Sequence, residues 1–235
     1  MDLNRVAIAT ITWARNKEEE QLLVLSLEQL AKTGLPVFIT DAGSSESFLH
    51  FLEANNTFIL TKSIKGVWPQ ALNSLQAASQ KQHPFIFYTE PDKVGFFTNA
   101  LHTFLENING DENTGVVIAS RSATAFASFP AFQQATENMI NQCCIEVIGK
   151  NMDYVYGPFL MNAQLVRHLI ELPVDIGWGW RPFAFNTARR QGYTVSCREG
   201  DFFCPEQQQT DDSSERIYRM KQLVQNVEGL ILSEK

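Results

Sequence analysis

The sequence predicts an α/β protein with a doubly wound, mostly parallel sheet and helices on both faces of that sheet. Two observations lead to this prediction. Apolar, β-branched runs alternate with helix-like segments over roughly the first 120 residues, which is the pattern of parallel strands joined by crossover helices. No internal repeat and no Pro/Gly/Ser-rich linker divides the 235 residues, so we expect a single domain, 1–235, with halves 1–121 and 122–235.

The first half opens with an expected strand at residues 6–13, where nearly every side chain is apolar or β-branched, as in a strand covered on both faces. Asn16 and Glu19 have the spacing of a helix N-cap and its capping box, and Gly34 ends that helix. Further strands are expected at 36–40, 57–61, 85–88 and 115–120, and further helices at 48–52, 68–78 and 101–108.

The second half is less regular in its periodicity. Residues 199–212 are polar and rich in turn-forming residues, which is typical of a surface loop or of a lid over a site. Helices are expected at 125–150, 164–172, 180–191 and 213–230, and strands at 154–161 and 193–197.

Composition excludes several classes of protein. The formal net charge is -7 and no block of Lys and Arg is present, so a broad nucleic-acid surface is excluded and phosphate recognition must be local. The four cysteines lack zinc-site spacing, and the first residues lack the features of a secretory leader. No apolar run approaches the roughly 20 residues of a membrane helix. We therefore expect a cytoplasmic protein with no transmembrane segment.

The residues directly after each strand are the place to look for chemistry, because an open α/β sheet binds ligands outside the carboxyl ends of its strands. The first strand is followed by Thr12-Trp13-Ala14-Arg15, which contains no glycine. The sequence has no GxGxxG, no GxxxxGK[ST] and no GxSxG. These absences argue against a dinucleotide site, a P-loop and an α/β-hydrolase nucleophile.

Two of the other strand ends carry acidic residues. Asp41 ends the second strand, and Glu90 and Asp92 follow the strand at 85–88. Two carboxylates separated by one residue can face the same cation, and their oxygens suit Mg²⁺ or Mn²⁺. Each position also has a plainer interpretation: Asp41 fits an Asx turn before Gly43, and acid pairs in turns are often only solvated.

Four segments in this order resemble the GT-A-fold glycosyltransferases, in particular their large family-2-like group. The segments are Val6 to Arg15, Asp41-Ala42-Gly43-Ser44-Ser45, Gly66 with Ala71-Leu72-Asn73, and Phe85 to Asp92. Val116 to Arg121 is similar to the strand that follows in that group. Asp175-Ile176-Gly177-Trp178-Gly179-Trp180 is similar to its Gly/Trp-rich acceptor segment.

The resemblance implies a GT-A-type fold and transfer of a sugar from a UDP- or GDP-sugar to a hydroxyl or glycan acceptor, with Mn²⁺ or Mg²⁺ as cofactor. It implies roles for particular residues: Thr12 and Asp41 on the base and ribose, Gly66 and Asn73 along the nucleotide-sugar, Glu90 and Asp92 on the metal and diphosphate, and Asp175 as an acceptor-side general base. The chemistry of two other residue types adds candidates. Arg121 could bind a phosphate or a carboxylate bidentately, and Trp178 and Trp180, spaced by glycines, could form a flat platform for a sugar ring. A second copy of the chain is also considered as a partner.

The sequence departs from the family pattern at the metal motif. Glu90 stands at its first position, Pro91 stiffens its middle, and no His lies in the last sixty-odd residues. A catalytically degenerate protein that binds a nucleotide-sugar or a partner is therefore an alternative. A sugar-phosphate nucleotidylyltransferase is a further one, although the loop after the first strand lacks the Gly-rich sequence of that class.

Several of these residues also have structural interpretations. Asn73 could lie on a helix surface, Arg121 could pair with nearby acids, Trp178 and Trp180 could be core, and Asp175 could cap the next helix.

Overall fold

The structure is a computed structural model that describes residues 1–81 and 83–235. Contacts divide the chain into two compact units: unit 1 comprises Met1–Asp111 and Pro158–Ile170, and unit 2 comprises Glu112–Gly157 and Glu171–Lys235. The return of residues 158–170 to unit 1 makes both units discontinuous in sequence. This division differs from a split at residue 121, and the assignment of 1–121 and 122–235 to donor and acceptor remains a prediction.

Unit 1 contains a mostly parallel sheet. Its strands lie in the order β3-β2-β1-β4-β6, where β6 alone runs antiparallel, pairing with β4. Every residue of β1 is buried, as its continuous apolar and β-branched run predicts. The strands are β1 (Val6–Thr12), β2 (Val37–Asp41), β3 (Phe58–Leu60), β4 (Phe85–Tyr88) and β6 (Phe159–Asn162).

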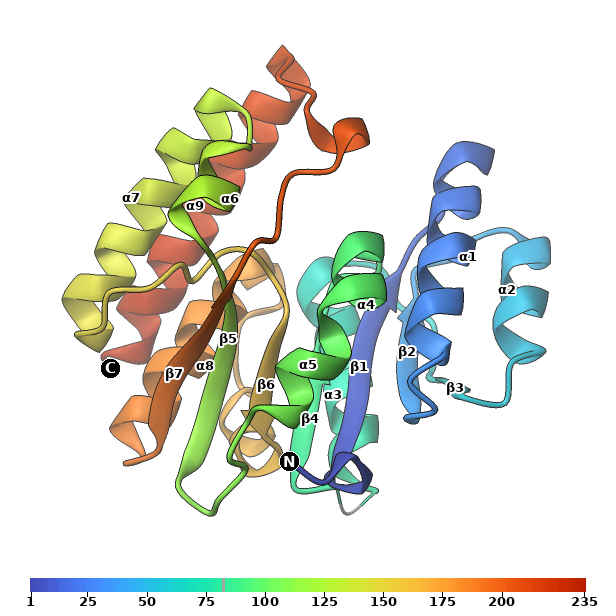
Figure 1. Cartoon of the computed structure of the whole chain (residues 1–235), viewed down its shortest axis with the longest axis horizontal. Helices are drawn as coiled ribbons and strands as arrows, with labels where there is room; N and C mark the ends of the chain where they lie inside the picture. Colours follow the sequence, from blue (N-terminus) through green and yellow to red (C-terminus); the bar gives the residue numbers. More distant parts are fainter. Residues whose placement is uncertain (82) are drawn as a thin grey trace. The chain divides into compact units, whose positions relative to one another are not determined.

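Helices lie on both faces of this sheet. Figure 1 shows α3 behind β1 and β4, and α4 and α5 in front of them. Asn16 caps α1 as predicted, because its side chain accepts a hydrogen bond of 2.9 Å from the Glu19 N–H. The helices of unit 1 are η1 (Leu3–Arg5), α1 (Lys17–Ala31), α2 (Glu46–Glu53), α3 (Val67–Ser79), α4 (Val94–Asn99), α5 (Leu101–Glu106) and η2 (Ala163–His168).

The strand order of unit 1 reverses between β1 and β4. The chain moves outward from β1 through β2 to β3, then returns to place β4 on the other side of β1. In an open α/β sheet the crevice at such a reversal, outside the carboxyl ends of the strands, is where ligands bind. The fold of unit 1 alone therefore indicates a ligand site at the carboxyl ends of β1 and β4.

Unit 2 packs helices against a pair of parallel strands. β5 (Thr114–Arg121) pairs with β7 (Thr194–Gly200), and α8 lies against both strands and against α9. The helices of unit 2 are α6 (Ala123–Ala127), α7 (Ala131–Ile148), η3 (Val174–Gly179), α8 (Trp180–Arg190), η4 (Glu206–Gln208) and α9 (Ser213–Ser233). The predicted alternation of strands and helices in an α/β protein is confirmed.

Three predicted elements differ from the structure. The helix expected at 125–150 is divided into α6 and α7, and α7 begins after Pro130. The strand expected at 154–161 is shorter, because β6 begins only at Phe159. Side chains bind the backbone before it: the Tyr154 N–H donates to Asn141 and the Val155 N–H to Asp153, which removes these groups from strand pairing. The helix expected at 164–172 is the short 3₁₀ helix η2, which ends at His168.

None of the helices formed by residues 1–81 and 83–235 combines the length and apolar character required to cross a membrane.

Candidate functional site

The turn after β4 is held against β1 at the strand-order reversal. The Thr10 hydroxyl donates a hydrogen bond of 2.8 Å to the Thr89 carbonyl, and the Thr89 N–H donates to the Ala9 carbonyl. Glu90 and Asp92 follow at once, and both are half-buried. The predicted acidic motif and the segment after β1 therefore leave neighbouring strands at the same edge of the sheet.

Asp41 organises the loops after β1 and β2. It is only 4% exposed, and its carboxylate accepts hydrogen bonds of 2.6–2.8 Å from the Thr12 hydroxyl, the Gly43 and Ser44 N–H groups and the Ser44 hydroxyl. A direct contact of this carboxylate with a base or ribose, as the resemblance implies, is therefore corrected to a positioning role. The Asx-turn interpretation fits, because the carboxylate is fully engaged in shaping its own turn.

Thr12 is also buried, and its side chain points to Asp41 rather than outward. A direct role of the Thr12 hydroxyl on a base or ribose is therefore corrected to a positioning role. Gln70 of α3 was not identified from sequence, yet its amide donates 2.9 Å hydrogen bonds to the Thr12 and Thr40 carbonyls. This amide ties the ends of β1 and β2 together. A buried polar residue inside an apolar helical stripe was the available signal.

Gly66 lies at the start of α3 and Asn73 lies on α3 itself, and their predicted position along the nucleotide-sugar remains a prediction. Gly66 has φ of +113°, which L side chains rarely adopt, and no side chain caps the N-terminus of α3 there. The Asn73 amide donates a 3.1 Å hydrogen bond to the Lys62 carbonyl, which fixes the loop after β3. Lys62 and Lys65 of that loop are exposed cations.

The Glu90–Asp92 turn fits a metal that arrives with phosphate. The Lys93 ammonium lies 3.8 Å from an oxygen of Asp92. Among the residues that the structure describes, no group of three or more His, Cys, Asp or Glu side chains could hold a metal by itself. Mg²⁺ in nucleotide enzymes is commonly bound through one or two carboxylates together with substrate phosphates. Two carboxylates therefore suffice only where the diphosphate completes the coordination.

Trp13 is a site candidate that the sequence reasoning passed over. It directly follows β1 and is 49% exposed, although a tryptophan beside a buried strand is usually packed inside. The Arg15 guanidinium lies 5.7 Å from the centre of its ring. An exposed indole at the strand-order reversal offers a stacking surface for a planar base.

Arg121 is buried in unit 2, and its side chain is not accessible to a ligand. Its side chain is 1% exposed and forms ion pairs of 2.7 Å with Glu137 and 2.6 Å with Asp153. Burial alone would lower the pKa of the guanidinium, but the two carboxylates outweigh burial and raise that pKa. The predicted phosphate contact of Arg121 is corrected to a buried structural ion pair.

The sugar platform predicted for the two tryptophans is also corrected. Trp180 is completely buried. Trp178 is nearly so, with its indole N–H donating to Tyr218 and the Arg181 guanidinium 4.8 Å from its ring centre. The glycines between them serve packing. A Cβ on Gly179 would lie 2.1 Å from the Gln225 carbonyl oxygen of α9, so the segment needs glycine to approach that helix.

Asp175 is exposed at the start of η3. It does not cap a helix, since Pro173 precedes η3, Gly179 precedes α8, and neither position has a side-chain cap. Its predicted role as a general base therefore stays a prediction, while the capping interpretation is excluded.

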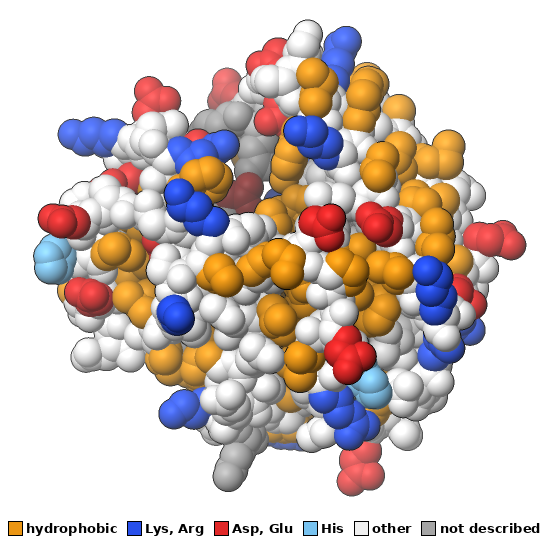
Figure 2. Space-filling model, turned by 180° about the vertical axis from the view of Figure 1, so that it is seen from behind, with side chains coloured by type: hydrophobic (Ala, Val, Ile, Leu, Met, Phe, Trp, Pro, Cys, Tyr) orange, Lys and Arg blue, Asp and Glu red, His pale blue; other side chains and the backbone are white. Residues whose placement is uncertain are grey.

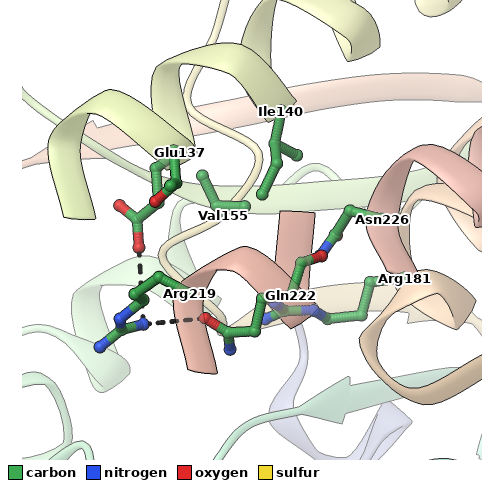
Figure 3. A pocket seen from close by; sticks show the side chains of 8 residues that line it. Glu137, Ile140, Val155, Arg181, Arg219, Gln222 and Asn226 are labelled. Atoms are coloured by element: carbon green, nitrogen blue, oxygen red, sulfur yellow. Dashed lines mark hydrogen bonds and ion pairs between the residues drawn. The ribbon is translucent and has the colours of Figure 1, made fainter. Parts of the chain in front are cut away.

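Unit 2 contains a small polar cavity next to α8 and α9. Figure 3 shows Arg219 between Glu137 and Gln222, with Arg181 on the other side of the cavity. The cavity measures about 30 Å³, on the order of one or two waters. It is too small for a sugar ring. Its lining residues are Thr136, Glu137, Ile140, Val155, Arg181, Arg219, Gln222 and Asn226.

No protein-family model and no curated protein sequence matches the chain. Solved structures match it by fold. Glucosyl-3-phosphoglycerate synthase from Mycobacterium tuberculosis, in complex with uridine diphosphate, has a TM-score of 0.64 at 11% identity, over 97% of this chain and 79% of the synthase. The same synthase with Mn²⁺, UDP-glucose and phosphoglyceric acid has a TM-score of 0.62 at 11% identity, over 95% of this chain and 79% of the synthase.

A mannosyltransferase from Pyrobaculum calidifontis, in complex with GDP-Man and Mn²⁺, is similar with a TM-score of 0.54 at 12% identity, over 97% of this chain and 73% of that chain. The chain therefore has a GT-A-like fold, which confirms the fold class implied by the four sequence segments. At these identities the likeness establishes the fold and leaves the chemistry to be argued from residues.

Proposed function

We propose that the protein transfers a sugar from a UDP- or GDP-sugar to a hydroxyl group of a small-molecule or glycan acceptor. The observation that carries the proposal is the position of Glu90-Pro91-Asp92, which follows β4 beside the end of β1, where the strand order reverses. The GT-A-like fold supports the same reaction class, since the compared transferases are described in complex with UDP, UDP-glucose or GDP-Man.

The donor would lie across the carboxyl ends of β1, β2 and β4. Trp13 offers its exposed ring to the base, while the Thr12–Asp41 pair and Gln70 hold the loop that carries Trp13. The uncapped N-terminus of α3 and the nearby Lys65 favour the negative charge of a diphosphate. These residues orient the donor so that its anomeric carbon is presented to an acceptor.

Glu90 and Asp92 would hold Mn²⁺ or Mg²⁺ in this site. When bound, such a cation supplies charge that stabilises the departing diphosphate. Two carboxylates would leave the diphosphate to complete the coordination, so binding of metal and nucleotide is expected to be mutually dependent. Asp175 of unit 2 is proposed as the base that takes a proton from the acceptor hydroxyl.

A second candidate is a protein that binds a nucleotide-sugar without turning it over. The Lys93–Asp92 ion pair favours it, because a cation within the chain already occupies part of the space around the metal motif. A nucleotidylyltransferase is disfavoured, since the loop after β1 contains no glycine.

Two measurements on the full chain test the proposal. In a thermal-shift screen, UDP, GDP, CDP and dTDP are each added with and without Mn²⁺. A nucleotide at 100 times its Kd stabilises the fold by about 2.7 kcal/mol, which raises the midpoint by roughly 5–10 °C for a chain of this size. We expect UDP or GDP to do so, and more strongly with Mn²⁺.

Release of nucleoside diphosphate from UDP-glucose and GDP-mannose is then followed with an acceptor panel. Turnover supports the transferase. Nucleotide binding with no release across the panel supports the binding protein, and no nucleotide binding at all removes both proposals.

A further inference from the structure

One face of the C-terminal helix α9 is apolar and exposed. Four of its side chains are between 50% and 65% exposed, and a fifth, Val227, is half-buried. Figure 2 shows hydrophobic side chains gathered on the side of the molecule that carries α7 and α9, on the right of that view. These five residues, called here the α9 stripe, are Ile217, Met220, Val224, Val227 and Ile231.

The α9 stripe is not the face by which α9 joins its own unit. The opposite face packs on η3, α7 and α8, and Gly229 approaches Gly179 so closely that a Cβ would lie 1.9 Å from the Gly179 carbonyl oxygen. A helix packed on one side is expected to be polar on the other. Here the outer face repeats apolar residues at alternating steps of three and four, which is the a/d seam of a helix pair.

Charges beside the α9 stripe indicate the partner. Lys221 and Glu228 both flank it and are exposed, and neither forms a hydrogen bond or an ion pair with any residue that the structure describes. If two α9 helices pair antiparallel about a two-fold axis between Val224 and Val227, Lys221 of one copy faces Glu228 of the other. The two-fold axis forms this pair twice.

A parallel pair has the opposite consequence. In a parallel pair the flanking positions that meet are five residues apart, so Arg216 of one copy would face Lys221 of the other. Like charges at those positions destabilise the pair, whereas the antiparallel arrangement matches opposite charges. In the antiparallel register Met220 meets Ile231 and Val224 meets Val227, which gives four apolar contacts about the two-fold axis, while Ile217 lies opposite Glu234 at the edge of the pair.

We propose that the α9 stripe binds a second copy of this chain, as an antiparallel helix pair with Lys221–Glu228 ion pairs at its edge. A membrane surface fits less well. Helices that lie on membranes carry Lys and Arg along the polar face, whereas this stripe is bordered by both signs of charge on a chain with net charge -7. The proposal is independent of the sugar-transfer reaction.

The first test is sedimentation velocity of the full chain between about 1 and about 100 µM, where small protein interfaces associate. We expect a monomer–dimer equilibrium. Val224→Asp, which places a charge at the centre of the seam in both copies, raises the Kd at least about 100-fold. Leu25→Asp, an equally drastic change at a 49% exposed position of α1, leaves the equilibrium unchanged. A wild-type chain that stays monomeric throughout overturns the proposal.

Charge reversal tests the orientation, with changes confined to the surface so that folding is preserved. Lys221→Glu and Glu228→Lys each raise the Kd by about tenfold, and the double variant returns it to the wild-type value. Failure of the double variant to restore association overturns the antiparallel pair. A chain that is monomeric in solution but floats with phosphatidylserine-containing vesicles, and loses that binding in Val224→Asp, assigns the stripe to a membrane instead.

Discussion

Units 1 and 2 differ in what happens to polar residues at the ends of strands. In unit 1 the segments that follow β1 and β4 carry exposed or half-buried side chains, so Trp13, Glu90 and Asp92 are accessible to a ligand. In unit 2 the residue that ends β5, Arg121, is covered by aromatic rings. The ring centres of Phe126 and Phe129 lie 4.6 and 4.4 Å from its guanidinium carbon. Accessibility at a strand end therefore depends on what packs over the residue, as the two rings do over Arg121.

The two units also differ in what their buried residues do. Thr12 and Asp41 are buried in unit 1, but their hydrogen bonds shape the loops that border the proposed donor site. Trp178 and Trp180 are buried in unit 2, and their contacts hold helices together. Asp175 is the exception among the residues selected in unit 2, because it is exposed. Four predictions test these distinctions.

Asp175→Asn carries the largest expected effect. If Asp175 takes the proton from the acceptor, the change lowers kcat by about 100- to 10,000-fold while the Kd of the nucleotide stays constant, because the interaction acts in the transition state. Steady-state release of nucleoside diphosphate and titration of the nucleotide measure the two quantities. Glu171→Gln removes an exposed carboxylate of the same segment and serves as the matched control. Normal turnover in Asp175→Asn excludes the base assignment and would leave unit 2 without a catalytic residue.

Arg121→Met is expected to lower the free energy of unfolding by about 3–5 kcal/mol, because Glu137 and Asp153 lose their buried cation. Denaturant unfolding measures this. Arg189→Met, which breaks an exposed ion pair with Glu234, is the control and costs about 1 kcal/mol or less. Nucleotide affinity at a temperature where the Arg121 variant is folded stays unchanged. A stable variant that has lost nucleotide binding would restore the phosphate-binding interpretation.

The pH dependence of Arg121→Met follows from Asp153. Burial alone would raise the pKa of that carboxyl, but the charge and hydrogen bonds of Arg121 outweigh burial and lower it. In the wild type Asp153 thus contributes stability that is fully present above its unfolded-state pKa, near about 3.9, and is lost as pH falls through the lower folded-state pKa. Without Arg121 the burial effect dominates and the pKa of Asp153 rises, so the buried carboxyl is more readily protonated at pH 5. The loss of unfolding free energy caused by Arg121→Met should therefore be smaller at pH 5 than at pH 7.

Local sequence predicted most of the fold because the relevant signals are local. The buried run of β1, the Asn16 cap and the position of β4 depend on residues close in sequence, and all are found in the structure. The carboxyl-end rule then located the acidic motif. Element lengths were less predictable where side chains bind the backbone, as Asn141 does before β6.

Burial at the candidate site could not be predicted in the same way, because it depends on residues distant in sequence. Arg121 is buried by Glu137 and Asp153, which lie 16 and 32 residues further along the chain. The Gly177 and Gly179 positions are explained only by α9, whose Gln225 fills the space where side chains would go. Trp13 was passed over for the complementary reason: its exposure is a tertiary property that a strand-like run of apolar residues conceals.

Asp92→Asn is the third prediction, and it concerns the accessible end of β4. We expect about a 100-fold loss of Mn²⁺-dependent nucleotide affinity, and a smaller loss in Glu90→Gln, whose longer side chain is more easily replaced by water. Calorimetric titration of the nucleotide with and without Mn²⁺ measures both, with the exposed Glu28→Gln of α1 as control. If both variants keep the wild-type affinity and metal dependence, the Glu90–Asp92 turn is structural and the contrast between the two units disappears at this position.

Trp13→Ala is expected to have the smallest effect, about a tenfold increase in the Kd of the nucleotide. Stacking of a base on an aromatic ring contributes about 1–3 kcal/mol, and a ring that remains half exposed belongs near the lower end of that range. Because about half of the Trp13 side chain is already exposed, the melting temperature should change little, which separates loss of a ligand contact from loss of stability. Trp13→Phe keeps a smaller stacking face and should recover part of the affinity, whereas Leu25→Ala, another half-exposed apolar residue of unit 1, should leave affinity unchanged. An affinity that is equal in all three variants would mean that exposure after β1 does not mark the base-binding position, and that the nucleotide approaches the sheet from the β2 and β3 side instead.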